Sequence, residues 1–369
     1  MDGIYRFSAP GRTEICGNHT DHQHGCVLAA AVNLEARAEV QLNGSKTVRV
    51  ISDGYAPIEL SLDELDVRTD ERNTTAALVR GVAAGFVSRG CKPRGFDAHI
   101  SSSVLAGSGL SSSAAFEVLM GRIFNGLFFD GRLTPAEIAQ IGQYAENVYF
   151  GKPCGLMDQM ASSMGGLVYI DFGSPDSPYV EKIDFDFSHC GYTLCIIDSG
   201  ADHAALTGEY ASIPHELSLI CSVFGKHSLR DVDESEFYAR LPELRHAAGD
   251  RAVLRAMHVF DENRRVALLV QALKSGDFDS FLSGINHSGL SSWLYLQNVT
   301  PSGGIEHQDM AFTLALCRRL LNGRGAVRIH GGGFAGTALA FVPDEEFLTF
   351  SVRLEAVLGA GSCHRLEII

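Results

Sequence analysis

Residues 104–118, VLAGSGLSSSAAFEV, join an expected strand to an expected helix. Gly107 and Gly109 permit tight or left-handed turns, because glycine has no Cβ. The first amide groups of the following helix lack internal partners, and the helix dipole adds positive potential there. The hydroxyl groups of the three serines that follow supply further hydrogen-bond donors or a metal ligand. The stretch therefore predicts a polyphosphate-binding turn, with a serine-capped helix after an ordinary glycine turn as the structural alternative.

Two other phosphate-binding patterns do not fit this stretch. No G-x-x-x-x-G-K-[ST] sequence occurs in the chain, which excludes a Walker loop. A dinucleotide-binding fingerprint would need a third glycine where Ser112 stands.

The sequence on either side predicts a mixture of strands and helices. The expected strands cover residues 26–42, 47–53, 95–104, 165–172 and 191–200, with a strand–glycine turn–strand unit at 326–342. The expected helices cover residues 75–90, 111–128, 134–151 and 344–359, with a long helical tract at 204–285. Thr134 as N-cap, Pro135 in the first turn and Glu137 completing a capping box mark one helix start.

The order of these elements predicts the fold class. Because strands and helices do not alternate regularly, we expect an α+β fold in two parts and not a doubly wound sheet. A chain of 369 residues with 46% hydrophobic residues is long enough to bury two cores. The loop GSPDSP at 173–178 is the predicted boundary, which divides the chain into domains at 1–175 and 176–369.

Charge and cysteine usage exclude several classes of partner. The formal net charge of -14 repels nucleic acid and anionic membranes, so neither is an expected partner. The nine cysteines form no C-x-x-C pair and have no regular spacing, which favours reduced thiols over a secreted disulfide framework. The N-terminal sequence has no signal-peptide pattern, and no apolar run approaches 18 residues. We therefore expect a cytoplasmic protein, as a monomer or small homo-oligomer.

Residues 16–25, CGNHTDHQHG, hold three histidines and one aspartate. This composition suits a metal site, a catalytic centre or a sugar-binding loop. The spacing of His19, His22 and His24 matches no recognised zinc pattern, and no cysteine lies at a matching interval. A solvated polar turn is the structural alternative.

A run of three glycines at 331–333 lies between two expected strands. Such a run is typical of a hairpin or a bulge. It also suits a backbone that approaches a ligand so closely that a side chain would block it.

Taken in order, four segments resemble the galactokinase family. PGRTEICGNHTDHQHGCVLAAAV resembles the galactokinase signature, and GSGLSSSAAFEV resembles the phosphate loop of the wider superfamily of GHMP small-molecule kinases. AENVYFGKPCGLMDQMASSMGG at 145–166 is similar to the galactokinase catalytic segment, and GGGFAG resembles the third motif of the superfamily. The resemblance covers nearly the whole chain, and four motifs in the right order are more specific than any one alone.

This resemblance implies a two-domain GHMP kinase fold. It consists of an N-terminal α/β domain and a C-terminal ferredoxin-like α+β domain, with the active site in the cleft between them. The implied activity is transfer of the ATP γ-phosphoryl group to the anomeric hydroxyl of a hexose, most simply galactose. The implied cofactors are ATP and magnesium, and the implied partners are a small-molecule sugar and ATP.

The resemblance also implies a role for particular residues. Asp158 matches the catalytic aspartate, and Arg12 matches the arginine that pairs with it and stabilises charge on the transferring group. Ser112 or Ser113, together with Glu146, match the magnesium ligands. The implied nucleotide-binding residues are Gly107, Ser108, Gly109, Leu110, Ser111, Ser112, Ser113, Gly332 and Gly333, and the implied sugar-binding residues are Asn18, His19, Asp21, Gly155 and Tyr210.

Three positions depart from the family pattern. Asn18 stands where galactokinases carry a glutamate that contacts the hydroxyl on the sixth carbon, so galacturonate, arabinose and N-acetylgalactosamine are alternative substrates beside galactose. His330 and Ala335 replace a threonine and a glycine in the last motif. A non-catalytic sugar and ATP sensor on the same fold is the second hypothesis, although the serine-rich turn and Asp158 are both intact.

Overall fold

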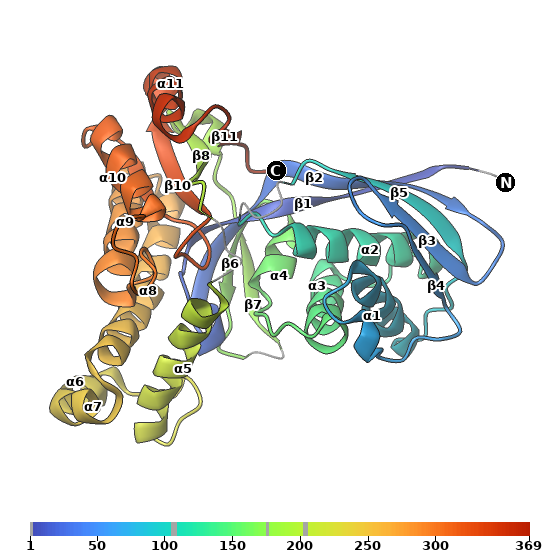
Figure 1. Ribbon diagram of the computed structural model, residues 1–369, viewed down its shortest axis with the longest axis horizontal. Coiled ribbons are helices and arrows are strands. Elements are labelled where there is room, and N and C mark those ends of the chain that lie inside the picture. Colours follow the sequence, from blue (N-terminus) through green and yellow to red (C-terminus); the bar gives the residue numbers. More distant parts are fainter. Residues whose placement is uncertain (1–2, 105–108, 175–176, 202–205) are drawn as a thin grey trace.

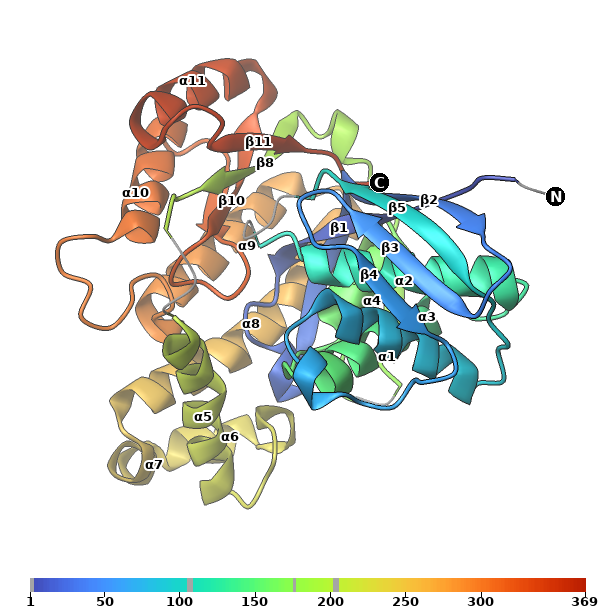
Figure 2. The ribbon, with the colours of Figure 1, turned by 45° about the vertical axis from the view of Figure 1, so that its right-hand side comes forward.

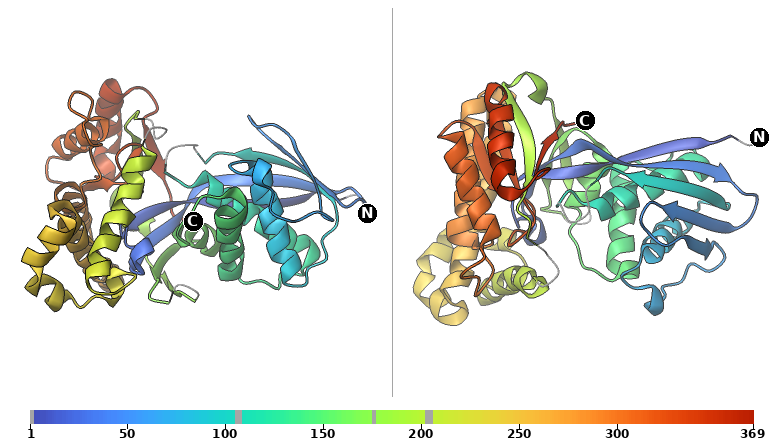
Figure 3. Two further views of the ribbon diagram at one scale, coloured as in Figure 1. Left: turned by 60° about the horizontal axis from the view of Figure 1, so that its bottom comes forward. Right: turned by 45° about the horizontal axis from the view of Figure 1, so that its top comes forward.

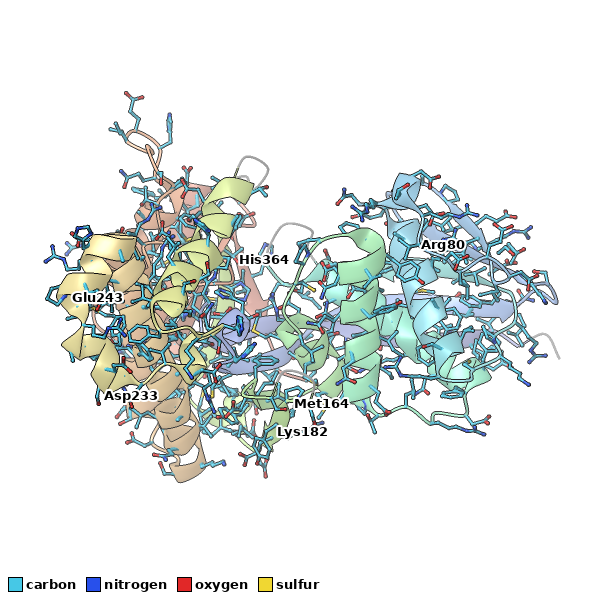
Figure 4. All side chains as sticks on the ribbon, turned by 90° about the horizontal axis from the view of Figure 1, so that it is seen from below. Arg80, Met164, Lys182, Asp233, Glu243 and His364 are labelled. Carbon is cyan, nitrogen blue, oxygen red and sulfur yellow. The ribbon has the colours of Figure 1, made fainter. Side chains whose placement is uncertain are left out.

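The computed structural model describes residues 3–104, 109–174, 177–201 and 206–369, which form two halves lying side by side (Figure 1). In Figure 1 the N-terminal half lies on the right and the C-terminal half on the left. Two further views show the long strands β1 and β2 running between the halves (Figure 3). Seen from below, Arg80 and Glu243 lie at opposite ends of the molecule, with Met164 between them (Figure 4).

The N-terminal half is built on a mixed sheet of seven strands in the described part of the chain. The strands are β1 (Tyr5–Cys16), β2 (Cys26–Leu42), β3 (Thr47–Ser52), β4 (Ile58–Ser61), β5 (Phe96–Ser102), β6 (Leu167–Asp171) and β7 (Tyr179–Ile183). Their order is β4-β3-β5-β2-β6-β7, with β1 paired to β2, and only β3 and β5 are parallel neighbours. The helices below this sheet in Figure 1 are α1 (Thr75–Ser88), α2 (Ser112–Phe128), α3 (Pro135–Tyr144) and α4 (Met157–Met164).

The C-terminal half is built on an antiparallel sheet with the order β11-β8-β10-β9. Its strands are β8 (Tyr192–Asp198), β9 (Ala326–Ile329), β10 (Thr337–Pro343) and β11 (Cys363–Leu366). Numbered within this half, the order is 4-1-3-2 with helices after the first and third strands, which is the ferredoxin-like arrangement. Its helices are α5 (Thr207–Val223), α6 (Glu234–Ala239), α7 (Leu241–Ala248), α8 (Asp250–Ser275), α9 (Phe278–Ser291), α10 (Asp309–Leu321) and α11 (Phe347–Leu358).

Helices α5, α6 and α7 lie together at one end of this half, below the second sheet in Figure 2. Shorter turns of helix connect the main elements. The π-helical turns are η3 (Ala145–Phe150) and η6 (Ser292–Leu296), and the 3-10 turns are η1 (Asp21–Gln23), η2 (Thr69–Glu71), η4 (Phe187–His189), η5 (Leu229–Asp231) and η7 (Asp344–Glu346). No helix of the described residues has both the length and the apolar character that crossing a membrane requires.

One apolar core connects the two halves. Its largest cluster joins side chains of β1, β2 and α2 to Leu269 of α8, Phe281 of α9 and Phe341 of β10. The final residues also return to the first sheet, where Ile368 pairs with Val32. The halves are therefore packed as one body around the long strands β1 and β2.

Most elements confirm the sequence-based expectations, and the α+β fold class is confirmed. The capping box at Thr134 is present in full, with reciprocal bonds to Glu137. The expected tract at 204–285 is wrong as one unit, because it contains five separate α-helices in its described part. The sequence did not predict β1, β4, β7, α4, α10 or β11 as elements. The domain boundary at 175/176 stays a prediction; β7 follows it and pairs with β6 of the first sheet.

Candidate active site

An ion pair between Arg12 and Asp158 lies at the centre of the site, and 146 positions separate the two residues in the sequence. Arg12 Nε donates to Asp158 Oδ1 over 2.8 Å, and Ser111 Oγ donates to the second oxygen, Oδ2, over 2.5 Å. The Arg12 side chain is 6% exposed and the Asp158 side chain 32% exposed. The carboxylate is thus held on one side and open on the other.

The surroundings of Asp158 keep its carboxyl ionised. Burial acts to raise the pKa of this group, but the charge of Arg12 and the hydrogen bonds from Arg12 and Ser111 outweigh burial and lower the pKa below its usual value. A carboxylate that stays deprotonated at neutral pH can accept a proton from a bound hydroxyl.

A bulge in β1 places Arg12 in this position. The register of β1 against β2 shifts between Pro10 and Arg12, and the Arg12 backbone N–H donates to the Leu110 carbonyl over 3.1 Å. Its guanidinium Nη1 also donates to the Gly109 carbonyl. Bulges near active sites re-aim a side chain in this way. Strand β1 is thereby attached to the turn that precedes α2.

The described part of the serine-rich turn forms the start of α2. Ser111 is the N-cap residue and has a left-handed backbone with φ of 55°, and α2 begins at Ser112. Leu110 is fully buried and anchors the turn, whereas Ser112 is exposed and Ser113 half-buried. Gly107 and Ser108 lie outside the described residues. The amides of the first turn of α2 are available for an anion because no earlier carbonyl of the helix pairs with them.

Glu146 lies in η3, where the helix 134–151 expected from the sequence becomes π-helical. It is buried, and its two oxygens accept from Lys152 Nζ over 3.3 Å and from Gln159 Nε2 over 2.9 Å. Gln159 Nε2 also donates to Glu117, one turn after Ser113 on α2, over 2.9 Å. Gln159 thus links the elements that carry Glu146 and Ser113.

Two buried oxygens beside Glu146 lack a hydrogen-bond partner among the described residues, namely Oε1 of Glu117 and Oε1 of Gln159. Burial and the charge of Glu146 raise the pKa of Glu117 well above its usual value. No group of three or more histidine, cysteine or acidic residues in the described chain is placed to hold a metal. The oxygens of Glu146 and Ser113 are nevertheless the hard ligands that magnesium takes alongside phosphates and water.

Asp21 and Gly155 lie against each other. A Cβ added to Gly155 would lie 2.2 Å from Asp21 Oδ2, so any side chain at this position would displace the carboxylate. Burial raises the pKa of Asp21, although the neighbouring His19 opposes this effect. The loop at 16–25 and the segment before α4 therefore meet at this carboxylate.

A directional chain of hydrogen bonds runs through the histidines of the loop. The Leu229 N–H donates to Gln23 Oε1 over 3.1 Å, which leaves Gln23 Nε2 as the donor to His22 Nδ1 over 3.2 Å. His22 Nε2 must then donate to His19 Nδ1, at 3.1 Å, and His19 Nε2 to the Gly332 carbonyl, at 3.0 Å. Burial lowers the pKa of His22 to about 3, so this ring is neutral at physiological pH.

Each carbonyl of the glycine run 331–333 accepts a bond from one predicted sugar-binding residue. Asn18 Nδ2 donates to the first over 2.6 Å, His19 Nε2 to the second over 3.0 Å, and Tyr210 Oη to the third over 2.8 Å. The amide oxygen of Asn18, which is 1% exposed, accepts from Asn298 Nδ2 over 2.9 Å. The glycine run thus packs beside the loop at 16–25, and direct contact of Asn18 or His19 with a ligand would need exchange of these bonds.

His330, one of the departures from the family pattern, is buried next to the turn that precedes α2. Its ring bonds to Thr13 Oγ1 over 3.1 Å and to Thr337 Oγ1 over 2.9 Å. A Cβ on Gly109 would lie 3.1 Å from His330 Nδ1, so Gly109 is in contact with this ring. Burial lowers the pKa of His330 well below its usual value, and the ring is neutral.

Sequence reasoning missed the residues of the C-terminal half that hold the loop at 16–25. They are His258, Glu262 and Asn263 of α8, and Asn298. Each is a single polar residue in a helical or loop sequence, so no local pattern distinguishes it. The sequence does contain one usable signal, since His258 and Glu262 are polar residues four positions apart, which places them on one face of an expected helix.

Comparison with known protein families identifies two matching profiles. Residues 77–166 match the GHMP kinases N terminal domain, and residues 2–42 match the galactokinase galactose-binding signature. Among named proteins, a galactokinase of Actinobacillus pleuropneumoniae serotype 3 is 33% identical over 349 residues, covering 92% of this chain and 85% of the relative. A galactokinase of Glaesserella parasuis serovar 5 is 33% identical over 353 residues with the same coverage.

Solved structures share the whole fold. The galactokinase of Lactococcus lactis, complexed with galactose, superposes with a TM-score of 0.83 at 25% identity, covering 99% of this chain and 93% of that protein. The mevalonate kinase of Methanococcus jannaschii superposes with a TM-score of 0.71 at 14% identity, over 100% of this chain and 99% of its own. The second likeness concerns the fold alone.

Proposed function

The chain belongs to the galactokinase family of the GHMP kinases, and we propose that it transfers the γ-phosphoryl group of ATP to the anomeric hydroxyl of galactose, giving galactose 1-phosphate and ADP. The observation that carries this proposal is the ion pair of Arg12 and Asp158, held against the turn that begins α2. A carboxylate, a guanidinium and the first amides of a helix are groups that suit phosphoryl transfer to an alcohol.

Asp158 is the group that receives the proton of the sugar hydroxyl. Its two oxygens each accept one hydrogen bond from the protein, and each keeps a further lone pair. Because its pKa is lowered, the carboxylate is a weak base, and it serves chiefly to orient the hydroxyl and to accept the proton as the bond to phosphorus forms.

Arg12 has two tasks in this mechanism. Its charge keeps Asp158 ionised, and it lies close enough to the turn to stabilise negative charge that develops on the transferring group. Because the guanidinium is planar and presents several donors in a fixed geometry, it bonds to Asp158 and to the Gly109 carbonyl at the same time.

The nucleotide phosphates are proposed to bind at the turn before α2. The Leu110 carbonyl and the Ser111 hydroxyl already bond to Arg12 and Asp158, so phosphate contacts would come from the backbone amides and from the hydroxyls of Ser112 and Ser113. Gly107, Ser108 and Gly109 belong to the same proposed turn. Gly332 and Gly333 are proposed to border it from the C-terminal half.

Magnesium would be held by Glu146 and Ser113. The carboxylate and hydroxyl oxygens suit this ion, and the partnerless Oε1 of Gln159 leaves an acceptor for one of its water ligands. When bound, the ion neutralises charge on the phosphates. The Lys152 ammonium, 3.3 Å from Glu146 Oε1, is the cation that this ion would join or displace.

The sugar is proposed to bind between Asp158 and Asp21. Asp21 and the peptide of Gly155 would bind hydroxyl groups of the sugar directly. A carboxylate that pairs with the hydroxyls of one epimer loses a partner when another epimer binds, so this contact would discriminate between epimers. Asn18, His19 and Tyr210 all bond to the glycine run 331–333. These three residues would therefore lie at the edge of the sugar site together with this run.

An ADP-release assay with galactose, galacturonate, arabinose, talose and N-acetylgalactosamine tests this function. We expect galactose to give the highest kcat/KM, with activity that depends on added magnesium. ADP release that no sugar of this panel stimulates would refute the sugar-kinase proposal. Higher kcat/KM with galacturonate would redirect it to an acid sugar, for which the neutral amide of Asn18 in place of a glutamate is the structural reason.

A further inference from the structure

We propose that Glu262 of α8 is a positioning residue, which holds the loop at 16–25 in the shape that presents Asp21 to the sugar. This inference rests on the proposed function, in which Asp21 of this loop binds the sugar. It concerns a residue of the C-terminal half that bonds neither to the pair of Arg12 and Asp158 nor to the turn before α2.

The loop needs an external support because its backbone is unfavourable by itself. Gly17, His19 and His24 all have positive φ angles, of 110°, 59° and 56°. A left-handed backbone is ordinary for glycine but costs free energy for histidine, and it persists only where the surroundings enforce it. A Cβ on Gly17 would lie 2.7 Å from the Cys26 carbonyl, so the two ends of the loop are in direct contact.

Glu262 is in hydrogen-bond contact with the start of this loop. Its Oε1 accepts from the Gly17 N–H over 3.1 Å and from the Asn18 N–H over 3.4 Å, the two amides that precede the strained His19. The same oxygen accepts from Cys16 Sγ over 3.1 Å and from Ser288 Oγ over 2.5 Å, and Oε2 pairs with Arg265. One carboxylate thus joins the loop to both α8 and α9.

The charge of this carboxylate makes its bonds strong. Glu262 is fully buried, and burial alone would raise its pKa, but His258, Arg265 and Arg328 lower the pKa to about 2. Hydrogen bonds to an ionised acceptor are shorter and stronger than neutral ones.

The same helix also holds the far end of the loop. Asn263 Oδ1 accepts from the Cys26 N–H over 2.8 Å, and His258 Nε2 donates to the Asn18 carbonyl over 3.0 Å. A Cβ on Gly25 would lie 2.3 Å from Asn263 Oδ1, so the chain passes too close to α8 for any side chain. Helix α8 therefore bonds to the chain on both sides of the strained residues, before His19 and after His24.

The test compares Glu262→Gln with Asp261→Asn as the matched control. Asp261 is the preceding residue, loses the same charge, and pairs with Arg264 on the helix surface instead of with the loop. For Glu262→Gln we expect the sugar KM to rise on the order of 10-fold, with kcat and the KM for ATP within about twofold of wild type, the pattern of lost binding without lost transition-state stabilisation. The control should match wild type in all three.

Two further measurements keep the inference open to refutation. Asn263→Ala, which leaves the buried carboxylate fully paired, should raise the sugar KM severalfold, and it decides the question if Glu262→Gln does not fold. Hydrogen exchange of residues 16–26 should be faster in the loop variants than in wild type and the control, and this readout needs no sugar.

Some outcomes would overturn the inference. An unchanged sugar KM with unchanged loop exchange in the folded variants would do so, as would a loss confined to kcat. Wild-type protein that releases no ADP with any sugar refutes the proposed function instead, and loop exchange then still decides whether Glu262 holds the loop.

Discussion

Asp158 is open to ligand on one side, while its partner Arg12 is almost wholly inside the protein. Removing the carboxylate therefore has two separate effects. It removes the group that accepts the proton, and it leaves a buried guanidinium without its counter-charge, which is strongly unfavourable.

Asp158→Asn should accordingly lower kcat on the order of 10²-fold or more, the scale of general-base loss. Sugar affinity should change little, because the amide keeps the shape of the carboxylate. Steady-state ADP release and sugar titration by calorimetry measure the two effects. Asp250→Asn, at an exposed position paired with Arg245, is the control. Near-normal turnover in a clean preparation would remove Asp158 from the mechanism.

Gly155→Ala should raise the sugar KM on the order of 10-fold, because its methyl group would occupy the place of Asp21 Oδ2. The comparison is with Gly208→Ala, whose added Cβ meets nothing within 4 Å. Initial-rate kinetics at saturating ATP give both values. Equal sugar KM in the two variants would contradict a role for Asp21 in binding the sugar.

Asn18→Glu should lower the melting temperature by several degrees. The new carboxylate would lie where Asn18 Nδ2 now donates to Glu14 Oε1 over 3.2 Å, so two buried like charges would meet. Differential scanning calorimetry measures this shift. A variant as stable as wild type, with a changed galactose-to-galacturonate ratio, would instead place this side chain at the sixth carbon of the sugar.

Among the elements, α3 shows how local sequence sets a helix start that the site depends on. Its capping box holds the first turn, and Ser163 of α4 donates to the Pro135 carbonyl over 2.7 Å. The helix that carries Asp158 is thus bonded to the first turn of α3.

Thr134→Ala should destabilise the protein by about 1 kcal/mol, since it removes the N-cap acceptor. Thr134→Ser keeps the hydroxyl and should stay close to wild type. Urea unfolding followed by circular dichroism measures the free energy of unfolding. Equal losses in the two variants would show that the methyl group, and not the cap, carries the effect.

The elements also show where the sequence was informative. The start of α2 and the capping box of α3 depend on local residues, so the sequence predicted both. Strand β1 was not predicted, because Pro10 and Gly11 interrupt its apolar pattern; in the structure they coincide with a bulge that aims Arg12. The sequence did not reveal the breaks in the long tract at 204–285. Gly249 and Gly276 each end a helix, but the residue composition of the tract does not change at these positions.

On the scale of the whole molecule, the sequence predicted the partners Arg12 and Asp158 through resemblance to a family. It did not predict Glu262 or the bonds to the carbonyls of 331–333. Those contacts join residues from 123 to 313 positions apart, and their polar side chains follow no local period.

Three buried histidines should make the folded protein sensitive to acid. Burial lowers the pKa of His22 to about 3, of His258 to about 4, and of His330 well below its usual value. Between about pH 4 and 6.5 the unfolded chain binds protons at these sites and the folded chain does not. The contribution of these histidines to stability is therefore complete above pH 6.5 and falls as pH decreases.

Each such histidine contributes about 1.4 kcal/mol per pH unit to this slope. Urea unfolding at several values between pH 7 and 5 measures the slope, and His330→Gln should reduce it by the share of one histidine. Replacement of the exposed His189 is the control, and a slope equal to wild type in His330→Gln would show that His330 is protonated in the folded state.

Strand β1 fixes the distance between two parts of the proposed site. It bonds to the turn before α2 at Arg12 and leads into the loop at 16–25 at Cys16, a distance of about 13 Å at the rise of a strand. Rocking of one half against the other cannot lengthen or shorten this segment. An insertion of one residue between Arg12 and Cys16 would therefore move the loop at 16–25 relative to the pair of Arg12 and Asp158.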